Sequence, residues 1–596
     1  MALLLVVAVS SVFLAARWVL AHGQEQRLSV ALASSLAVLA VLPELLGRPF
    51  SSLPIGLALT TLLAALPAAL ELRARRARTT APASITRAPA EWAALAVLIG
   101  LGTWTALTTF LWDEGSTHFG LSAALARGVL PPEHPLFPGA PFAYHYGYDV
   151  LVALVLRATA LPMAWCCDLA TVACLLGLAL ALADTGRALA GTRGAWLAVL
   201  VVPLGYGPAA ALLADGWGAA VPGISLVPAA WVSAQKLPPP VIASFFQHPQ
   251  GLGMPIALAL LLLASGDHQV VEPRAQRTRW AAVAVLLALL APAQTVFFLL
   301  TGLALCAVVV VGAYERRDPR ALAPLIVLAL AGAAGVVLAP LLRSGSGDAL
   351  IADGYFADAP AALVWRHVLL FGGSTLAIPF ALVRRRCGMA PLRAGLMAAA
   401  SAGFVVANVV SYARSWDVVK FFAVGAFFGN LLLADLLAAL VDGRALRRAV
   451  AVIILAASTW SGALWLLRHG PLNGVVAARY TERGPDRVGV ALLAAHGGTI
   501  GARARVLTTH TDVHQAGFLV EGADWRRGGE GYRLDRAAQD RAHARALRAL
   551  RTLQPADLLA TGADLVLVHG DAPSAAPLTK LGAVEGMSLY RLERAP

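Results

Sequence analysis

The chain has little lysine, little charge and few cysteines. Of its 47 basic residues only three are lysine, and charged residues make up 14% of its 596 positions. A water-soluble protein of this size needs more polar side chains to cover its surface, so this class is excluded. The hydrophobic fraction is 58%, and the mean hydropathy is +0.71. Repeated apolar runs of about 20 residues predict a polytopic, all-α helical membrane protein.

The five cysteines argue against two further kinds of structure. They lie in apolar runs or, for Cys387, in a basic loop, and no pair has the spacing of a metal site. We therefore expect neither a disulfide framework nor a zinc site with cysteine ligands. The net charge of +13 does not indicate nucleic acid, because the arginines cluster in short loops between apolar runs.

The apolar runs predict about fourteen membrane spans. Loop 73–90 is rich in arginine, which favours the cytoplasmic side, and five further basic loops follow along the chain. All six loops lie on one side of the membrane under two conditions. Segment 146–162 must be an interfacial or re-entrant helix that does not cross the bilayer. Segment 280–314 must be two spans, divided by Ala-Pro-Ala-Gln at 291–294. Residues 2–21 lack a basic leader and are interpreted as a retained span. Both chain ends then lie outside. The spans are 2–21, 28–46, 53–72, 91–112, 165–184, 194–214, 250–265, 280–296, 298–314, 321–341, 366–383, 394–412, 418–440 and 449–467, and the five further basic loops are 187–193, 274–279, 316–320, 384–393 and 444–448.

The last part of the chain differs in character. It is polar, and 504–510, 563–570 and 588–593 have the pattern of short strands, whereas 534–553 has that of an amphipathic helix. We predict a small α/β domain on the outer, extracytoplasmic side. Three parts follow, namely three N-terminal spans with a basic loop, a transmembrane catalytic module and this soluble domain. Their bounds are 1–90, 91–474 and 475–596.

The outer segments hold most of the unusual polar residues. These segments are 113–164, 215–250 and 343–366, with a fourth at 411–422. The first begins with Asp113-Glu114 at the end of a span. The candidate residues are Asp113 and Glu114 for catalysis; Arg414, Lys420, Arg366 and His248 for a donor phosphate; and His118, His134, Tyr144, His145, Tyr146 and Tyr148 for substrate.

This set of side chains suits transfer of a sugar from a lipid-linked phosphate. A carboxylate at the end of a span lies at headgroup depth and would act as general base toward a hydroxyl. Arginine and lysine would neutralise the phosphate that leaves. Tyrosine would stack on sugar rings, although it is also common at membrane interfaces.

The order of span, acid pair, histidine and the stretch LARGVLPPEHPLFPGAPFAYHYGYDVLVALVL, followed by many spans and an outer domain, resembles the GT-C superfamily of membrane glycosyltransferases. The Asp-Glu pair resembles that of its protein O-mannosyltransferase and aminoarabinose transferase branches. The FAYHYGY stretch resembles the tyrosine-rich YYY membrane family. The resemblance implies that Asp113 is the catalytic base and Glu114 the second acid of the motif. Arg414 and Lys420 match by location alone.

Simpler interpretations stand beside these. Asp113-Glu114 would also serve as solvated acids that end a span, and FAYHYGY as an aromatic belt. Lys420 would also belong to an ion-paired face with Arg414 and Asp417. His248 and Arg366 would also be polar residues at helix starts. The three histidines of the first loop, with Asp113, would bind a divalent cation, although their spacing matches no zinc signature.

The sequence thus predicts a bacterial inner-membrane glycosyltransferase of inverting GT-C type. It would take a sugar from a polyprenyl-phosphate donor and pass it to a glycan, lipid or protein acceptor on the outer face. No cofactor is expected beyond that cation. One rival is a transporter or lipid flippase, but few charges lie in mid-span and no internal repeat is evident. The other is a membrane scaffold whose outer domain binds a partner.

Overall fold

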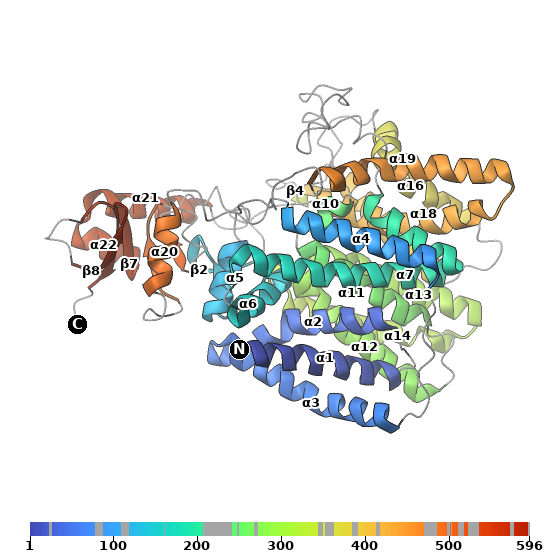
Figure 1. The fold of residues 1–596 in the computed structure, drawn as a ribbon, viewed down its shortest axis with the longest axis horizontal. Coiled ribbons are helices and arrows are strands. Elements are labelled where there is room, and N and C mark those ends of the chain that lie inside the picture. Colours follow the sequence, from blue (N-terminus) through green and yellow to red (C-terminus); the bar gives the residue numbers. More distant parts are fainter. Residues whose placement is uncertain are drawn as a thin grey trace.

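A computed structural model describes the helices of the membrane part and the strands of the C-terminal part. Its long helices lie side by side in one bundle, and a small sheet lies beyond one end of it (Figure 1). The described residues are 1–22, 25, 27–77, 87–108, 118–159, 161–205, 207, 241–246, 249–266, 272–343, 350–351, 363–383, 391–412, 418–469, 486–496, 501, 503–509, 518–521, 536–572 and 577–593.

The bundle confirms the predicted polytopic helical fold. Each predicted span coincides with a long helix, and α7 accounts for two of them. Among the described residues, ten helices are long and apolar enough to cross a membrane. The helices are α1 (Ala2–His22), α2 (Leu28–Gly47), α3 (Leu53–Ala77), α4 (Pro89–Thr108), α7 (Met163–Leu204), α11 (Pro249–Ser265), α12 (Pro273–Ala293), α13 (Thr295–Arg316), α14 (Pro324–Leu338), α16 (Leu363–Val383), α17 (Pro391–Val409), α18 (Val419–Val441) and α19 (Ala445–His469), with the short α10 (Val241–Phe245) and α15 (Pro340–Arg343) and the 3-10 turns η1 (Arg48–Phe50) and η4 (Pro319–Leu322) between them.

Two predicted breaks have clear local causes. Gln294 leaves helical geometry between α12 and α13, where Pro292 removes a backbone donor, and its side chain caps α13 by accepting from the Val296 N–H at 2.8 Å. In α7 the break is at Gly191, whose φ is +63°. A Cβ on Gly186 would lie 2.1 Å from the Gly194 carbonyl oxygen, so the two halves turn back on each other only through glycine.

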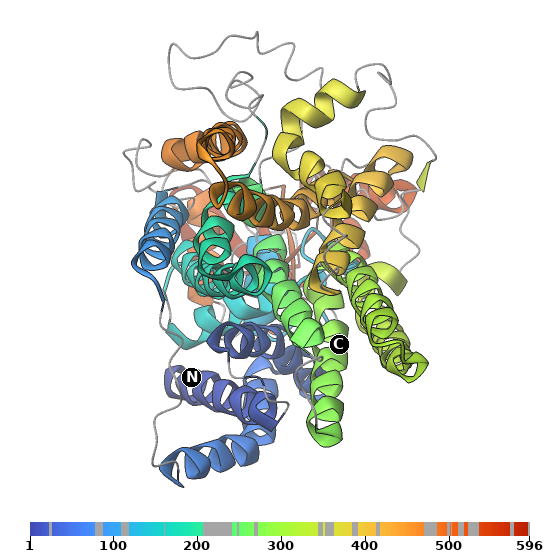
Figure 2. The same cartoon turned by 90° about the vertical axis from the view of Figure 1, so that its right-hand side faces the viewer.

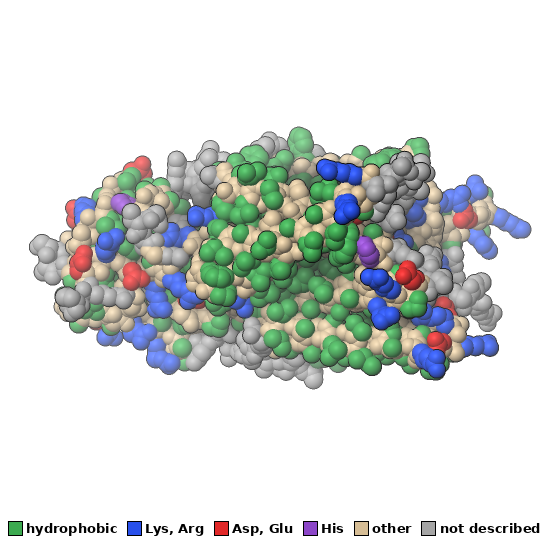
Figure 3. All heavy atoms as spheres, turned by 90° about the horizontal axis from the view of Figure 1, so that it is seen from below, with side chains coloured by type: hydrophobic (Ala, Val, Ile, Leu, Met, Phe, Trp, Pro, Cys, Tyr) green, Lys and Arg blue, Asp and Glu red, His purple; other side chains and the backbone are tan. Residues whose placement is uncertain are grey.

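Burial orders the helices from centre to rim. The helices α18, α7 and α2 are mostly buried, whereas α1, α14 and α19 expose most of their apolar surface. Figure 2 looks at the bundle from the end opposite the sheet, and α1, α2 and α3 form one flank beside α12. Exposed apolar side chains form a belt across the middle of the face that Figure 3 shows. Such a belt is what a protein surrounded by hydrocarbon requires.

A short helical cap lies between the bundle and the sheet. It comprises α5 (His118–Arg127), the antiparallel pair β1 (Glu133–His134) and β2 (Phe137–Pro141), and α6 (Gly147–Thr159). The 13 residues of α6 rise only about 20 Å, less than the hydrocarbon thickness of about 30 Å. The helix packs against α5, α7 and α2. This agrees with the prediction of a helix at 146–162 that does not cross the bilayer. A second small pair joins β3 (Leu350–Ile351) to β4 (Ser411–Tyr412).

The C-terminal part is the predicted small α/β fold. Its five strands have the order β6-β5-β7-β9-β8, parallel from β6 to β7 and antiparallel beyond. The sequence predicts β5, β7, β9 and α21; it misses β6, β8, α20 and α22. The elements are α20 (Asp486–His496), β5 (Arg505–Leu507), β6 (Leu519–Glu521), α21 (Arg536–Thr552), α22 (Pro555–Thr561), β7 (Leu565–His569), β8 (Leu578–Val584) and β9 (Met587–Leu592).

The sheet is attached to the cap by side-chain and backbone contacts. Leu136, in the β1–β2 turn, is 3% exposed and belongs to the apolar core of the C-terminal fold. The Val520 N–H donates to the Pro135 carbonyl at 2.8 Å, which extends the sheet edge. Arg503 pairs with Glu133 at 2.8 Å, and the Arg127 guanidinium lies 3.9 Å from the Phe518 ring centre.

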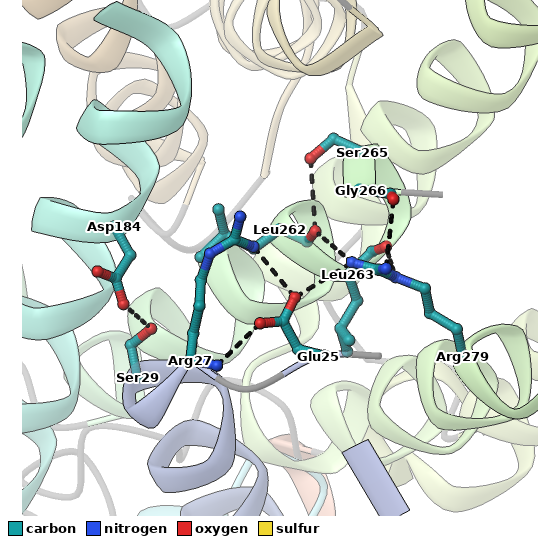
Figure 4. A network of polar contacts seen from close by, with 9 residues as sticks. All are labelled: Glu25, Arg27, Ser29, Asp184, Leu262, Leu263, Ser265, Gly266 and Arg279. Atoms are coloured by element: carbon teal, nitrogen blue, oxygen red, sulfur yellow. Dashed lines mark hydrogen bonds and ion pairs between the residues drawn. The ribbon is translucent and has the colours of Figure 1, made fainter. Parts of the chain in front are cut away.

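The other end of the bundle gathers the arginine-rich loops. Arg87 and Arg187 both pair with the buried Glu91, and Arg87 also reaches Asp184. Ser29 donates to Asp184, and nearby Arg279 pairs with Glu25 at 3.1 Å (Figure 4). Further contacts join Arg393 to Leu189 and Arg193 to Asp442. Five of the six loops predicted to share one side of the membrane therefore meet at one end of the bundle.

Candidate functional site

The candidate residues divide into those that the structure describes and those that it does not. Asp113, Glu114, His248 and Arg414 lie outside the described residues. Arg366 falls in the first turn of α16, and its side chain also lies outside them. The described candidates are His118, His134, Tyr144, His145, Tyr146, Tyr148 and Lys420.

A buried histidine–carboxylate pair joins α5 to α6. His118, the first residue of α5, lies with Nδ1 at 2.9 Å and 3.1 Å from the two carboxylate oxygens of Asp149. Ser122, one turn along α5, donates to the same carboxylate at 3.0 Å. Asp149 is fully buried and His118 is 4% exposed. The carboxylate holds the proton on Nδ1 and leaves Nε2 as the nitrogen able to accept another.

Aromatic rings and one lysine surround this pair. The Tyr144 ring centre lies 6.3 Å from that of His118 and 3.6 Å from that of His145. Lys420, in the first turn of α18, places its ammonium 4.6 Å from the Tyr144 ring centre. The structure thus brings together two outer segments, 113–149 and 411–422, that are nearly 300 residues apart. A half-buried cation at this place can bind a phosphate.

Tyr146 connects the site to the N-terminal helices. Its hydroxyl donates to Glu44 at 3.1 Å and accepts from Arg48 at 2.9 Å, and Arg48 also pairs with Glu44. Glu44 is near the end of α2 and Arg48 directly follows it. Burial, and then the neighbouring Glu44 carboxylate, raise the pKa of Tyr146 well above its ordinary value. The phenol therefore remains neutral and serves as a hydrogen-bond bridge.

The backbone beside Tyr146 is held against the α12–α13 break. The Tyr146 N–H donates to the Pro292 carbonyl at 3.2 Å, one of the acceptors that the break sets free. A Cβ on Gly147 would lie 2.9 Å from the Ala293 Cα and 3.5 Å from the Ala40 Cβ. The glycine in the FAYHYGY stretch is therefore needed for a close backbone approach.

Two predicted substrate residues have contacts that indicate packing. The buried Tyr148 hydroxyl lies 2.7 Å from the Cys167 carbonyl and 2.8 Å from the Thr171 hydroxyl, both on α7. The buried His134 accepts from the Leu136 N–H through Nδ1 at 3.2 Å, which closes the β1–β2 turn. We therefore infer that Tyr148 and His134 stabilise the fold of the cap.

The site also contains residues that the sequence does not single out. Asp149 is one of the unusual polar residues of the first outer segment but is not among the candidate site residues, and Ser122 resembles an ordinary small residue. Glu44 lies in a span outside the predicted catalytic module, and Arg48 lies directly after that span. A carboxylate in a short helix of otherwise apolar residues is a signal that could have identified Asp149. Among the described residues, no three histidine, cysteine or acidic side chains converge as a metal site would require, so His118, His134 and His145 do not form one together.

No protein-family model matches the sequence, and no curated protein matches it. Among solved structures, the chain is similar to apo ArnT from Cupriavidus metallidurans, with 14% identity, 84% of this chain and 97% of that chain covered, and a TM-score of 0.45. For the same protein bound to undecaprenyl phosphate, identity is 14%, coverage 84% and 98%, and the TM-score 0.42. The chain is also similar to the Archaeoglobus fulgidus oligosaccharyltransferase with a tethered acceptor peptide. The identity is 11%, the match covers 80% of this chain and 69% of that chain, and the TM-score is 0.39.

Proposed function

We propose that this protein is an inverting membrane glycosyltransferase. It transfers a sugar from a polyprenyl-phosphate donor to a hydroxyl-bearing acceptor on the outer, extracytoplasmic face of the cytoplasmic membrane. The observation that carries the proposal is the Lys420–Tyr144 contact. It places a half-buried cation for the donor phosphate beside the buried rings of Tyr144 and His145, at the end of the bundle opposite the arginine-rich loops.

The reaction assigns one task to each group. Asp113 removes the proton from the acceptor hydroxyl as its oxygen attacks the anomeric carbon. The bond from that carbon to the phosphate oxygen breaks on the opposite side, and polyprenyl phosphate leaves with the bonding electron pair. The negative charge of this phosphate increases by about one unit as it leaves, and the Lys420 ammonium neutralises the added charge. Glu114 is the candidate that supports the base. Arg414 and Arg366 are further candidates for binding the donor phosphate.

The sequence position of Asp113 supports this assignment. Thr108 ends α4 five residues before Asp113, and His118 begins α5 five residues after it. His118 is in turn held by Asp149 and lies near Tyr144. The chain around the proposed base is thus tied at both ends to elements that belong to the bundle and the cap.

The test separates donor binding from chemistry. Purified protein in nanodiscs would receive a panel of radiolabelled polyprenyl-phosphate sugars, with a membrane extract as acceptor source. We expect turnover of one donor. Asp113→Asn should lower kcat by about 10²- to 10⁴-fold while donor binding stays near wild type. Lys420→Gln should raise KM for the donor by roughly tenfold, because it removes a charge-assisted contact to the phosphate. It should lower kcat as well, because the charge that develops on the leaving phosphate is no longer neutralised.

Lys580→Gln is the matched control. This lysine is exposed on β8 and pairs with Asp571, far along the chain from the cap. It should leave both constants unchanged. Equal activity of wild type and Asp113→Asn would contradict the proposed base. If the protein turns over no donor but moves labelled lipid across proteoliposomes, the flippase interpretation replaces the transferase.

A further inference from the structure

An apolar groove lies between four helices on the flank of the bundle. Side chains from α1, α2, α3 and α12 enclose about 460 Å³. Ligand pockets in proteins typically have volumes of about 300 to 1,000 Å³. Seen from below, the apolar belt is hollowed along its middle (Figure 3). The lining includes Val12, Ala16, Val38, Ala64, Ala282 and Leu286.

The few polar atoms of the groove already have partners in their own helices. Ser34 donates to the Val30 carbonyl at 2.7 Å, Thr60 to that of Gly56 at 2.8 Å, and Thr278 to that of Arg274 at 3.1 Å. Bonds of this kind satisfy the hydroxyl without any ligand. The groove therefore offers a ligand only apolar contact, and the belt around it would lie in hydrocarbon. A lipid chain has the right chemistry and has direct access.

The groove reaches toward the arginine-rich end. Leu20 lines it two residues before α1 ends, and Thr278 lines it five residues after α12 begins. Arg274 precedes Thr278 by one turn on the same helix face, and Arg277 is its sequence neighbour; both are exposed. Glu272 is the exposed acid nearby, so the mouth of the groove keeps a net positive charge. Arg17 is not part of this mouth, because it pairs with Glu71.

We propose that the groove binds one acyl chain of an anionic phospholipid from the cytoplasmic leaflet. The phosphate would lie against Arg274 and Arg277, as basic positions beside helices on that side hold anionic headgroups. This proposal does not depend on the proposed enzyme activity. A carrier lipid is the poorer occupant, since its phosphate would then lie at the arginine-rich end, away from Lys420 and Tyr144.

Lipid retention tests the proposal directly. The protein would be reconstituted with equal amounts of phosphatidylglycerol and phosphatidylcholine, extracted in mild detergent, and its bound lipids counted by native mass spectrometry. We expect one retained phosphatidylglycerol in preference to phosphatidylcholine. Ala282→Trp, which fills the groove, should remove it. Leu330→Trp is the matched control, because Leu330 is 69% exposed on α14 and is not among the residues that line the groove.

A second pair of variants tests the headgroup contact. Arg274→Gln with Arg277→Gln should lower the preference for phosphatidylglycerol by about fivefold for each arginine. Arg317→Gln with Arg320→Gln changes two exposed arginines of another basic loop and should have no effect. If Ala282→Trp fails to fold, Ala282→Leu gives a smaller filling of the same space. Retention of both lipids equally, retention unchanged by filling, or retention of a polyprenyl phosphate added to the mixture would overturn the proposal.

Discussion

The pair of His118 and Asp149 is a buried polar contact between the two helices of the cap. The two residues lie 31 positions apart in sequence, on different helices, and their side chains are buried away from water. A buried carboxylate keeps its charge only where donors surround it, and here His118 and Ser122 both donate. The pair therefore fixes where α5 begins, directly after the segment that contains Asp113.

Removing the carboxylate should cost more than removing either donor. Asp149→Ala leaves a buried imidazole without its acceptor, and we expect a loss of about 1–3 kcal/mol in unfolding free energy. Ser122→Ala should cost about 1 kcal/mol or less, because His118 still satisfies the carboxylate. Thermal unfolding of both variants in one detergent measures the difference. Equal losses would mean that the imidazole contact contributes nothing beyond the hydroxyl.

Tyr146 predicts how stability changes at alkaline pH. Its pKa is raised in the folded protein above the value of 10.0 expected for an unfolded chain. The folded protein thus keeps the phenol proton where the unfolded chain has released it, so this stabilisation is complete below pH 10.0 and is lost as pH rises further. Tyr146→Phe should therefore lose less stability than wild type between neutral pH and pH 10.5 to 11.5, by roughly 1 kcal/mol. Parallel unfolding curves at all pH values would contradict this role.

At the scale of residues, the sequence pattern predicts which kinds of side chain form the site. It does not predict which residues each of them contacts. The FAYHYGY stretch is apparent as a cluster, yet its members separate on folding. Tyr144 faces Lys420, Tyr146 contacts α2, and Tyr148 packs on α7. Alternation of side chains along a short segment gives no information about which helix each will meet. The partners lie 19 to 276 residues away, and only tertiary structure brings them together.

At the level of elements, the apolar runs determine most of the fold. Spans, the Pro292 break and the short helix α6 are all predicted from run length and proline, because membrane thickness limits the choices. The β1–β2 pair is not predicted, since five residues such as Phe-Pro-Gly-Ala-Pro lack strand character and become a strand only by pairing.

The close approach of Gly147 to Ala293 makes a prediction about how the cap is seated. Gly147→Ala adds a Cβ that meets backbone at 2.9 Å, so α6 must shift away from the α12–α13 break. We expect a loss of about 1–3 kcal/mol in stability together with reduced transfer activity. Gly302→Ala on α13 is the control, because nothing lies within 4 Å of its added Cβ. It should be neutral or slightly stabilising. A Gly147→Ala variant as stable as the control would show that the cap is not held there.

At the scale of the whole molecule, the N-terminal helices and the C-terminal sheet both contact the cap. Glu44 and Arg48 bond Tyr146 from one side, and Leu136 enters the sheet core on the other. The sequence predicts three separate parts but not these contacts, because each connects residues from parts that look independent in composition. The cap that contains the proposed site is therefore contacted by both of the other parts.

Leu136 gives the sharpest test of that connection. Leu136→Asp would bury a charge in the core of the C-terminal fold, which we expect to release the sheet from the cap. Hydrogen exchange of β5 and β6 should rise, while the helices of the bundle keep their protection. Leu559→Asp is the control in the same fold, because that side chain is 44% exposed. Unchanged exchange in the Leu136 variant would mean that the sheet core closes without it.

The position of Leu136 also orders two steps of folding. More than 350 residues, including most of the bundle, separate it from β5, and β9 pairs between β7 and β8 although it follows both in sequence. Leu136 is therefore synthesised well before the strands that cover it. Docking of the C-terminal sheet on the cap thus follows synthesis of the bundle, and the cap contributes one of its own side chains to the core of that sheet.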